Sequence, residues 1–125
     1  MNERAILELA DRFFAAIPKG DLETVRAIYA PDAEIWHNND QATQNVSQNL
    51  AVLEWVTKNI ADMRYEDVRR QVTASGFVQQ HVLRGTAANG KALELPACIL
   101  CTVVDGRITR LEEYLDSAQV AVLFS

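Results

Sequence analysis

His37 is the residue of this sequence best suited by its type to exchange a proton at neutral pH, because an ordinary histidine has a pKa of about 6.5. It ends a short predicted strand in which Ile35 and His37 face one side and Glu34 and Trp36 face the other. If the first side faces a cavity, His37 can act there as a general acid or base. The alternative is a histidine whose ring is satisfied by a backbone group at the end of a strand.

Glu113 is the second candidate for proton chemistry. It alternates with Leu111 and Leu115, which have the spacing of core-facing residues on a strand. A carboxylate between two inward leucines must find a partner or shift its pKa upward. That partner is either a proton-carrying histidine or, in a purely structural role, Arg84 or Arg107 in a buried ion pair.

Cys98 and Cys101 form a Cys-x-x-Cys, a spacing that occurs in metal and redox sites. They lie in the apolar segment Leu95–Val104, which is typical of a strand. Residues three apart on a strand face opposite sides, so the two sulfurs should diverge. No second cysteine pair exists to complete a zinc site, and we expect two reduced thiols that bind no metal.

The composition is that of an ordinary globular protein. The 125 residues are 49% hydrophobic and 23% charged, which predicts one domain over residues 1–125. A net charge of −5 and the absence of a Lys/Arg cluster argue against a nucleic-acid-binding face. The N-terminal residues lack the apolar core of a signal peptide, and no apolar run reaches membrane-spanning length. The expected location is the cytoplasm.

The spacing of apolar residues predicts three helices in the first half of the chain, over Glu3–Ile17, Leu22–Tyr29 and Val46–Ile60. Pro31-Asp32 should end the second helix in a turn, after which the strand of His37 follows. Residues 38–45 are polar and are predicted to form a loop.

From Met63 onward the apolar period changes to two, which is typical of strands. Asn89-Gly90 and Asp105-Gly106 are strong hairpin signals between neighbouring strands. The predicted strands are Tyr65–Thr73, Phe77–Thr86, Ala92–Val104 and Arg107–Asp116, and Ser117–Phe124 should form a short closing helix. The order is therefore helix, helix, strand, helix and four antiparallel strands, an α+β fold with a curved sheet covering helices.

This order, together with Tyr29-Ala-Pro-Asp-Ala-Glu-Ile-Trp-His37 and Val104-Asp-Gly-Arg-Ile-Thr-Arg-Leu-Glu-Glu-Tyr-Leu-Asp116, resembles the nuclear transport factor 2-like superfamily over nearly the whole chain. Its SnoaL-like branch, which contains polyketide cyclases, is the most similar. The resemblance implies a cone-shaped mixed or antiparallel sheet wrapped around helices (a cystatin-like α+β barrel), with a pocket at the open end. It also implies a homodimer formed through the outer face of the sheet. The superfamily holds ketosteroid isomerase, scytalone dehydratase, limonene epoxide hydrolase and members without chemistry, so the fold does not determine the reaction.

An overlay on ketosteroid isomerase places His37 where that enzyme has its Asp base. The two oxyanion donors of the isomerase, a Tyr and a protonated Asp, fall on Phe13 and on Ile99 or Leu100. Steroid isomerisation by that route is therefore not expected. For strand 77–86 we prefer this overlay, in which the side chains of Gln80, Val82 and Arg84 point inward.

An overlay on limonene epoxide hydrolase places His37 on a pocket Asn and Ile35 on a Tyr. The Arg and the two Asp of the hydrolase fall on Gln79, His81 and Glu113. Only one carboxylate remains, so epoxide opening in that form is not expected. This overlay turns Gln79 and His81 inward, whereas in the alternative His81 lies on the outer face of the sheet.

If His37, His81 and Glu113 share a pocket, Glu113 can fix the tautomer of one histidine while the other moves a proton. Such a set suits enolisation, dehydration or cyclisation of an apolar carbonyl compound. A metal would use the same residue types, but the three come from separate strands without a His-x-His spacing, and no metal is expected. The candidates for the pocket wall, each of which could equally be plain core, are Phe13, Ile17, Trp36, Trp55, Gln79 and Ile99.

The sequence therefore predicts a small enzyme that performs acid–base chemistry on an apolar small molecule. No Gly-rich phosphate loop is present, so no nucleotide cofactor is expected, and we predict none of any other kind. The alternatives are a non-catalytic module that binds a small ligand and a structural dimer with a vestigial pocket. The expected partners are an apolar small molecule and a second copy of the chain, with no nucleic acid and no membrane.

Overall fold

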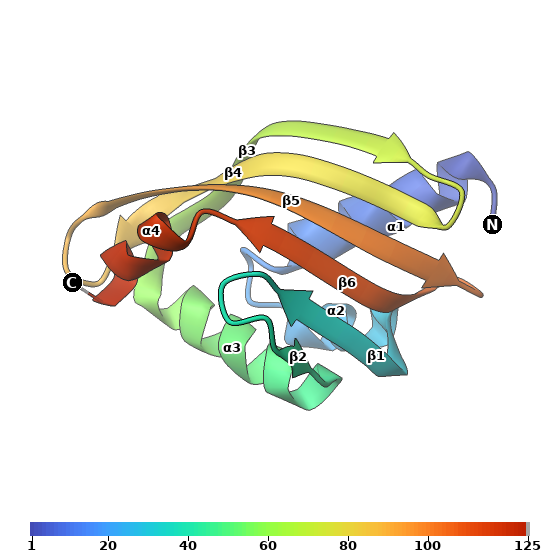
Figure 1. Cartoon of the computed structure of the whole chain (residues 1–125), viewed down its shortest axis with the longest axis horizontal. Helices are drawn as coiled ribbons and strands as arrows, with labels where there is room; N and C mark the ends of the chain where they lie inside the picture. The colour runs from blue at the N-terminus through green and yellow to red at the C-terminus, as the bar shows by residue number, and fades with distance from the viewer. Residues whose placement is uncertain (125) are drawn as a thin grey trace.

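The computed structural model describes residues 1–124 and consists of one six-stranded curved sheet with helices along one side (Figure 1). The helices are α1 (Glu3–Ala16), α2 (Leu22–Ile28), α3 (Val46–Asn59) and the short α4 (Ser117–Val120), which continues into the 3-10 turn η1 (Ala121–Phe124). The strands are β1 (Tyr29–His37), β2 (Thr43–Gln44), β3 (Ile60–Val72), β4 (Gly76–Ala87), β5 (Ala92–Val104) and β6 (Arg107–Leu115).

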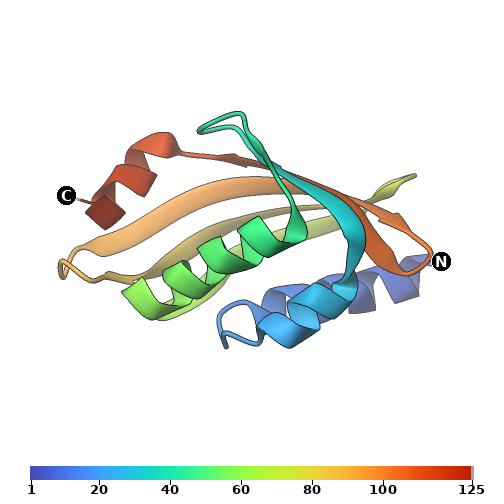
Figure 2. The ribbon, with the colours of Figure 1, turned by 90° about the horizontal axis from the view of Figure 1, so that it is seen from below.

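The strands follow the order β2-β1-β6-β5-β4-β3, and the sheet is not closed into a barrel. β1 runs parallel to β6 and every other described pair is antiparallel, so the sheet is mixed. Figure 2 shows the sheet arching over α2 and α3. The predicted α+β cone and the predicted order of its main elements are confirmed. Within residues 1–124, no helix has the length and apolar character needed to cross a membrane.

The core lies between the concave face of the sheet and the helices. The apolar face of α1 is buried there, with Leu9 at 0% and Phe13 at 1% exposure. Phe13 makes an edge-to-face contact with Tyr29 at the start of β1, with ring centroids 5.5 Å apart. Ile35 on β1 and Phe77 on β4 are also fully buried, so the core joins both ends of the sheet to the first helix.

The chain passes from α2 into β1 without the predicted turn. Tyr29 already has extended backbone angles, and β1 begins at this residue. Pro31 and Asp32 are exposed inside an irregular stretch, because the pairing with β6 shifts between Tyr29 and Glu34. The turn prediction was wrong because a proline without a donor is equally compatible with a bulge in an edge region of a sheet.

Three other boundaries differ from the sequence prediction. β3 begins at Ile60, directly after α3, and not at Tyr65, because buried Ile60 continues the apolar wall while the strand bends at shifted registers. Asp62 and Asp67 have positive φ at these irregularities, a backbone state that Asp tolerates. The polar segment 38–45 contains the short β2, and the closing helix is split into α4 and η1.

The two faces of β5 are chemically distinct. Alternate side chains from Leu93 to Cys101 point into the core, whereas Leu100 is 41% exposed on the outer face. Cys98 lies on that outer face and Cys101 is buried on the inner one, as the strand alternation predicted; both are free. Tyr114 on β6 is 47% exposed, so apolar surface continues across the outer face of the sheet.

Candidate functional site

His37 and Glu113 lie side by side at the ends of two parallel strands. The register of β1 with β6 pairs His37 with Glu113, and both side chains point to the concave side of the sheet. Asn38 continues this pairing beyond the end of β1: its backbone N–H donates to the carbonyl of Glu113 (3.0 Å), and its side-chain oxygen accepts from the N–H of Leu115 (2.9 Å). The alignment of the two functional groups is thus fixed by the backbone.

The side chains of the pair are in direct contact. Nε2 of His37 is 3.0 Å from Oε1 of Glu113, and each side chain is 17% exposed. Burial disfavours the charged imidazolium, but the hydrogen bond and the negative charge of Glu113, with a further contribution from Asp40, outweigh it and raise the pKa of His37. Since Nε2 is engaged by the carboxylate, Nδ1 is the ring nitrogen left to exchange a proton with a bound molecule.

Both residues open onto a cavity of about 350 Å³ between the sheet and α3. A smaller hollow of about 50 Å³ lies deeper, toward α1. Six residues line both spaces and mark the passage between them: Ile17, His37, Asn49, Leu53, Tyr65 and Glu113. The wall of the larger cavity is otherwise mostly aliphatic, with Asn39, Asp40 and Gln44 on one side. His37 and Glu113 therefore lie where the larger, mostly apolar cavity meets the deep hollow.

The wall residues predicted from sequence occupy different positions. Phe13 and Ile99 line the deep hollow, Ile17 lines both spaces, and Trp55 lines the larger cavity. Trp55 is 40% exposed and stacks on Phe124, with ring centroids 5.3 Å apart. Trp36 was predicted wrongly: it points to the convex face, where its ring packs on Tyr114 at 5.2 Å, because it alternates with the inward Ile35.

On β4 the inward residues are Gln79 and His81, which are 0% and 4% exposed. The preferred overlay of this strand, with Gln80, Val82 and Arg84 inward, is wrong. A one-residue difference in register exchanges the two faces of a strand, and Gln80 is exposed. Arg84 instead pairs with Glu66 (3.3 Å) and Asp67 (3.1 Å) on β3.

His81 lies in an aromatic environment near the pair but is not hydrogen-bonded to it. Its ring packs on Phe14 and Tyr65, with centroids 5.8 and 4.6 Å apart, and its Nδ1 is 3.0 Å from the side-chain amide of Gln79. Burial lowers the pKa of His81; the charge of Glu113 opposes this and that of Arg70 adds to it. The three residues named from sequence thus lie in one region, with His37 and Glu113 in contact and His81 apart.

Several polar residues of the site were not identified from the sequence, among them Tyr29, Gln44, Asn49 and Tyr65. The hydroxyl of Tyr29 donates to Oδ1 of Asn49 (2.9 Å), and the amide of Asn49 donates to Gln44 (3.3 Å). Tyr65 lines both spaces, and burial, with the charge of Glu113 added, raises its pKa, so its hydroxyl stays protonated. The capping box of Asn45 and Gln48, which starts α3 and so orients Asn49, was the available signal.

The sequence suggested Arg84 or Arg107 as a buried ion-pair partner of Glu113, and neither arginine is its partner in the structure. Arg84 lies on the outer face with Glu66, and Arg107 begins β6 six residues before Glu113. Among residues 1–124, no group of three or more His, Cys, Asp or Glu side chains is arranged to hold a metal ion.

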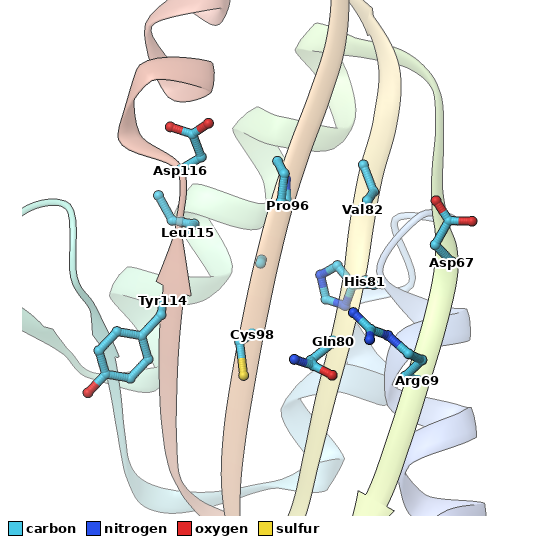
Figure 3. Close-up of a pocket in the computed structure, with 11 residues that line it drawn as sticks. Asp67, Arg69, Gln80, His81, Val82, Pro96, Cys98, Tyr114, Leu115 and Asp116 are labelled. Atoms are coloured by element: carbon cyan, nitrogen blue, oxygen red, sulfur yellow. The ribbon is translucent and has the colours of Figure 1, made fainter.

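A second hollow, of about 450 Å³, is open to solvent on the convex face of the sheet (Figure 3). It is lined by residues of β3 to β6, among them Arg69, Gln80, Cys98 and Tyr114. Figure 3 shows the His81 ring extending from β4 toward β5, next to this group of outward side chains. His81 lines this convex hollow and neither space of the His37 cavity, whereas Leu115 lines both the convex hollow and the larger cavity.

Comparison with known protein families finds a match that spans most of the chain. The family model described as the SnoaL-like domain matches residues 10–111. Uncharacterised proteins of Mycobacterium tuberculosis and Mycobacterium bovis are each 35% identical over 121 residues, which cover 91% of this chain and 91% of the relative.

Solved structures share the fold at lower sequence identity. A candidate polyketide cyclase from Xanthomonas campestris pv. campestris superposes with a TM-score of 0.85 at 19% identity, covering 100% of both chains. A nuclear transport factor 2-like protein of unknown function from Burkholderia pseudomallei has a TM-score of 0.84 at 23% identity, covering 100% of this chain and 99% of the other. IdmH, a candidate polyketide cyclase from Streptomyces antibioticus, has a TM-score of 0.81 at 22% identity, covering 95% and 97%.

Proposed function

The chain belongs to the SnoaL-like domain family, and on this premise we propose that it is a small cofactor-independent enzyme that performs acid–base chemistry on an apolar carbonyl compound. The proposal rests on one observation: His37 and Glu113 are in contact at the place where the larger apolar cavity meets the deep hollow. The cyclase-type relatives of the fold agree with a reaction of the isomerase, dehydratase or cyclase class. The expected location in the cytoplasm is part of the same proposal.

In this reaction His37 is the base. Neutral His37 donates Nε2–H to the Glu113 carboxylate, which leaves the Nδ1 lone pair free to take a proton from the carbon next to a carbonyl group. The C–H electron pair moves into an enolate, and the imidazolium that forms is stabilised by Glu113. Return of the proton from Nδ1 to another atom of the substrate completes an isomerisation or allows ring closure or loss of water to follow.

The pH dependence follows from the raised pKa of His37. The base form is neutral, so proton abstraction should increase as the pH rises through a value above about 6.5. Without the carboxylate, burial alone would move this increase to lower pH.

The reaction class can be tested without knowledge of the natural substrate. In D₂O, the wild-type protein should catalyse exchange of the α-protons of 2-tetralone or 2-decalone, measured by mass spectrometry. His37→Gln should lower this rate by at least about 100-fold, as removal of a general base does. The matched control is Glu112→Gln, because Glu112 lies on the outer face beside Arg110. Exchange at the buffer rate with wild-type protein, or equal rates with His37→Gln, would refute acid–base catalysis of this class.

Ligand binding without turnover is the second candidate. It is favoured by the aliphatic wall of the cavity, to which Leu53, Val56 and Leu93 contribute and which needs no catalytic group to hold an apolar molecule. Under this alternative, 2-tetralone binds wild type and His37→Gln equally well and exchanges its protons in neither. We also propose that two copies of the chain associate through the convex face, where Leu100 and Tyr114 are exposed.

A further inference from the structure

The polar side chains that line both the larger cavity and the deep hollow are His37, Asn49, Tyr65 and Glu113. His37 and Glu113 are in contact with each other at 3.0 Å. Asn49 accepts a hydrogen bond from the hydroxyl of Tyr29 over 2.9 Å. Within residues 1–124, the hydroxyl of Tyr65 makes no hydrogen bond. Tyr65 is therefore the polar residue of this set whose side chain is not engaged by the protein.

The Tyr65 hydroxyl faces the space of the cavity. The ring of Tyr65, on β3, is held by edge-to-face contacts with Phe14 on α1 and His81 on β4, with centroids 5.3 and 4.6 Å apart. In the described part of the chain, every fully buried side-chain nitrogen or oxygen has a hydrogen-bond partner. Because the Tyr65 hydroxyl has none, it is not fully buried, and the hollows that Tyr65 lines are the larger cavity and the deep hollow. A ligand in these spaces can therefore reach it.

The surroundings of Tyr65 keep its hydroxyl a donor. Burial and the negative charge of Glu113 both raise the pKa of Tyr65, so the phenol stays protonated at neutral pH. A protonated phenol can donate one hydrogen bond to a ligand oxygen. It does not compete with His37 for a substrate proton, because the ring would first have to lose its own. The two residues are thus suited to different parts of one molecule.

The charges around the cavity limit the class of ligand. Among the described residues, the side chains lining the two spaces include the carboxylates of Asp40 and Glu113 but no Lys or Arg. A carboxylate or phosphate ligand would meet this negative charge without a cationic partner, and an unpaired anion in an apolar enclosure is strongly disfavoured. A neutral carbonyl oxygen needs only a hydrogen-bond donor, which Tyr65 supplies.

We propose that Tyr65 is a catalytic residue whose O–H donates a hydrogen bond to the oxygen of a neutral apolar ketone, and that the site rejects carboxylates of similar shape. The catalytic part rests on the function proposed above, and the ligand-binding part does not. When Nδ1 of His37 takes the proton from the carbon next to the carbonyl group, the C–H electron pair forms an enolate. The negative charge then develops on the oxygen that Tyr65 holds, which strengthens this hydrogen bond.

Tyr65→Phe tests the catalytic part, because it removes the hydroxyl and keeps the ring that packs on Phe14 and His81. The matched control is Tyr114→Phe, which removes a hydroxyl from the outer face, where Tyr114 is 47% exposed, and keeps the apolar ring. In the D₂O exchange assay with 2-tetralone, Tyr65→Phe should be about 100-fold slower than wild type, as is typical for loss of one oxyanion donor. Tyr114→Phe should exchange at the wild-type rate. Equal rates for the two variants would overturn the catalytic role.

The hydrogen bond itself is tested by ¹³C NMR of 2-tetralone labelled at its carbonyl carbon and bound to the protein in H₂O. A hydrogen-bonded carbonyl carbon resonates downfield of the same carbon in a hydrocarbon solvent. Bound to wild type and to Tyr114→Phe, the label should have the shift of a hydrogen-bonded carbonyl, and in Tyr65→Phe it should move upfield. A hydrocarbon-like shift in wild type, or the same shift in all three proteins, would overturn the proposal. The wild-type measurement does not depend on how well any variant folds.

The ligand class is tested by comparing the Kd of 2-tetralone with those of tetralin, which lacks the oxygen, and of 1,2,3,4-tetrahydro-2-naphthoate, which carries a carboxylate. Wild type should bind 2-tetralone about 2- to 10-fold more tightly than tetralin, the range of one neutral hydrogen bond, and Tyr65→Phe should lose this preference. The carboxylate should bind most weakly. Tightest binding of the carboxylate, equal binding of 2-tetralone and tetralin, or no binding of 2-tetralone would overturn the proposal.

Failure of Tyr65 and failure of the proposed function give different results. If His37→Gln abolishes exchange and Tyr65→Phe does not reduce it, His37 remains the base and Tyr65 is not the donor. If the ¹³C shift depends on Tyr65 but wild type exchanges no protons, Tyr65 binds the ligand oxygen and the proposed catalysis is refuted.

Discussion

Replacing Glu113 by Gln should lower the pKa of His37 from above its ordinary value to below it. The substitution keeps the shape of the side chain and a hydrogen-bonding group near Nε2, which lies 3.0 Å from the carboxylate, but removes the negative charge. Burial has the largest influence on the pKa of His37, and it disfavours the imidazolium. In the variant, only the more distant negative charge of Asp40 opposes this effect of burial.

The size of the change follows from the geometry of the pair. An opposite charge in contact moves a pKa by about 1–3 units, and each unit corresponds to about 1.36 kcal/mol. Both side chains keep 17% exposure, so solvent screens part of the interaction. We therefore expect the lower part of the range, a decrease of about 1–2 units, or about 1.4–2.7 kcal/mol.

The assay is an NMR titration of the two histidine rings in wild type, Glu113→Gln and Glu112→Gln. Glu112 is the matched control, since it carries the same charge one residue earlier and pairs with Arg110 at 2.8 Å on the outer face. The pKa of His81 should also decrease in Glu113→Gln, by less than that of His37, because it feels the charge without a hydrogen bond. If Glu113→Gln and Glu112→Gln change the pKa of His37 equally, the pair does not control this proton.

The same pair makes a stability prediction with a definite sign. A histidine whose folded-state pKa is raised stabilises the fold fully below its unfolded value of about 6.5, and this stabilisation is lost as the pH rises through the folded-state pKa. Urea unfolding should therefore show wild type losing stability relative to Glu113→Gln over that interval. An opposite slope would mean that the imidazolium is not favoured in the folded protein.

Three further predictions concern the framework of the site. Leu100→Arg on the convex face should shift the sedimentation coefficient from dimer to monomer, whereas Ala15→Arg on the exposed side of α1 should leave it unchanged; a monomeric wild type would refute the proposed interface. Gly76→Ala should reduce the free energy of unfolding by more than about 2 kcal/mol in urea denaturation, because its Cβ would lie 2.0 Å from the carbonyl oxygen of Cys101; a neutral effect would contradict the close strand contact. Asn38→Ala should destabilise the fold by about 1–2 kcal/mol through the lost bridge between β1 and β6, and should move the His37 pKa toward that of Glu113→Gln; an unchanged titration would show that the bridge does not hold the pair together.

The sequence determined the elements and the character of the site because these depend on local patterns. Apolar periods of 3.6 and of two located the helices and the four long strands, and Asn89-Gly90 and Asp105-Gly106 located two hairpins. Alternation also showed that Glu113 would lie among inward leucines and that Cys98 and Cys101 would face opposite sides. Each of these inferences needs only the residues within one element.

The tertiary structure decided every feature that depends on how one strand pairs with another. The parallel register of β1 and β6 brings His37 to Glu113, and no local signal specifies a pairing between residues 76 positions apart. The face of β4 that carries His81 was likewise fixed by its register with β3 and β5, since a shift of one residue exchanges inside and outside. Trp36 was misassigned to the pocket although its alternation with Ile35 and His37 already placed it on the opposite face of the strand. Tyr65 was overlooked because an aromatic side chain has the same local pattern on either face of a sheet. Whether it lines a cavity depends on what packs against that face, and that is settled only when α3 and the sheet come together.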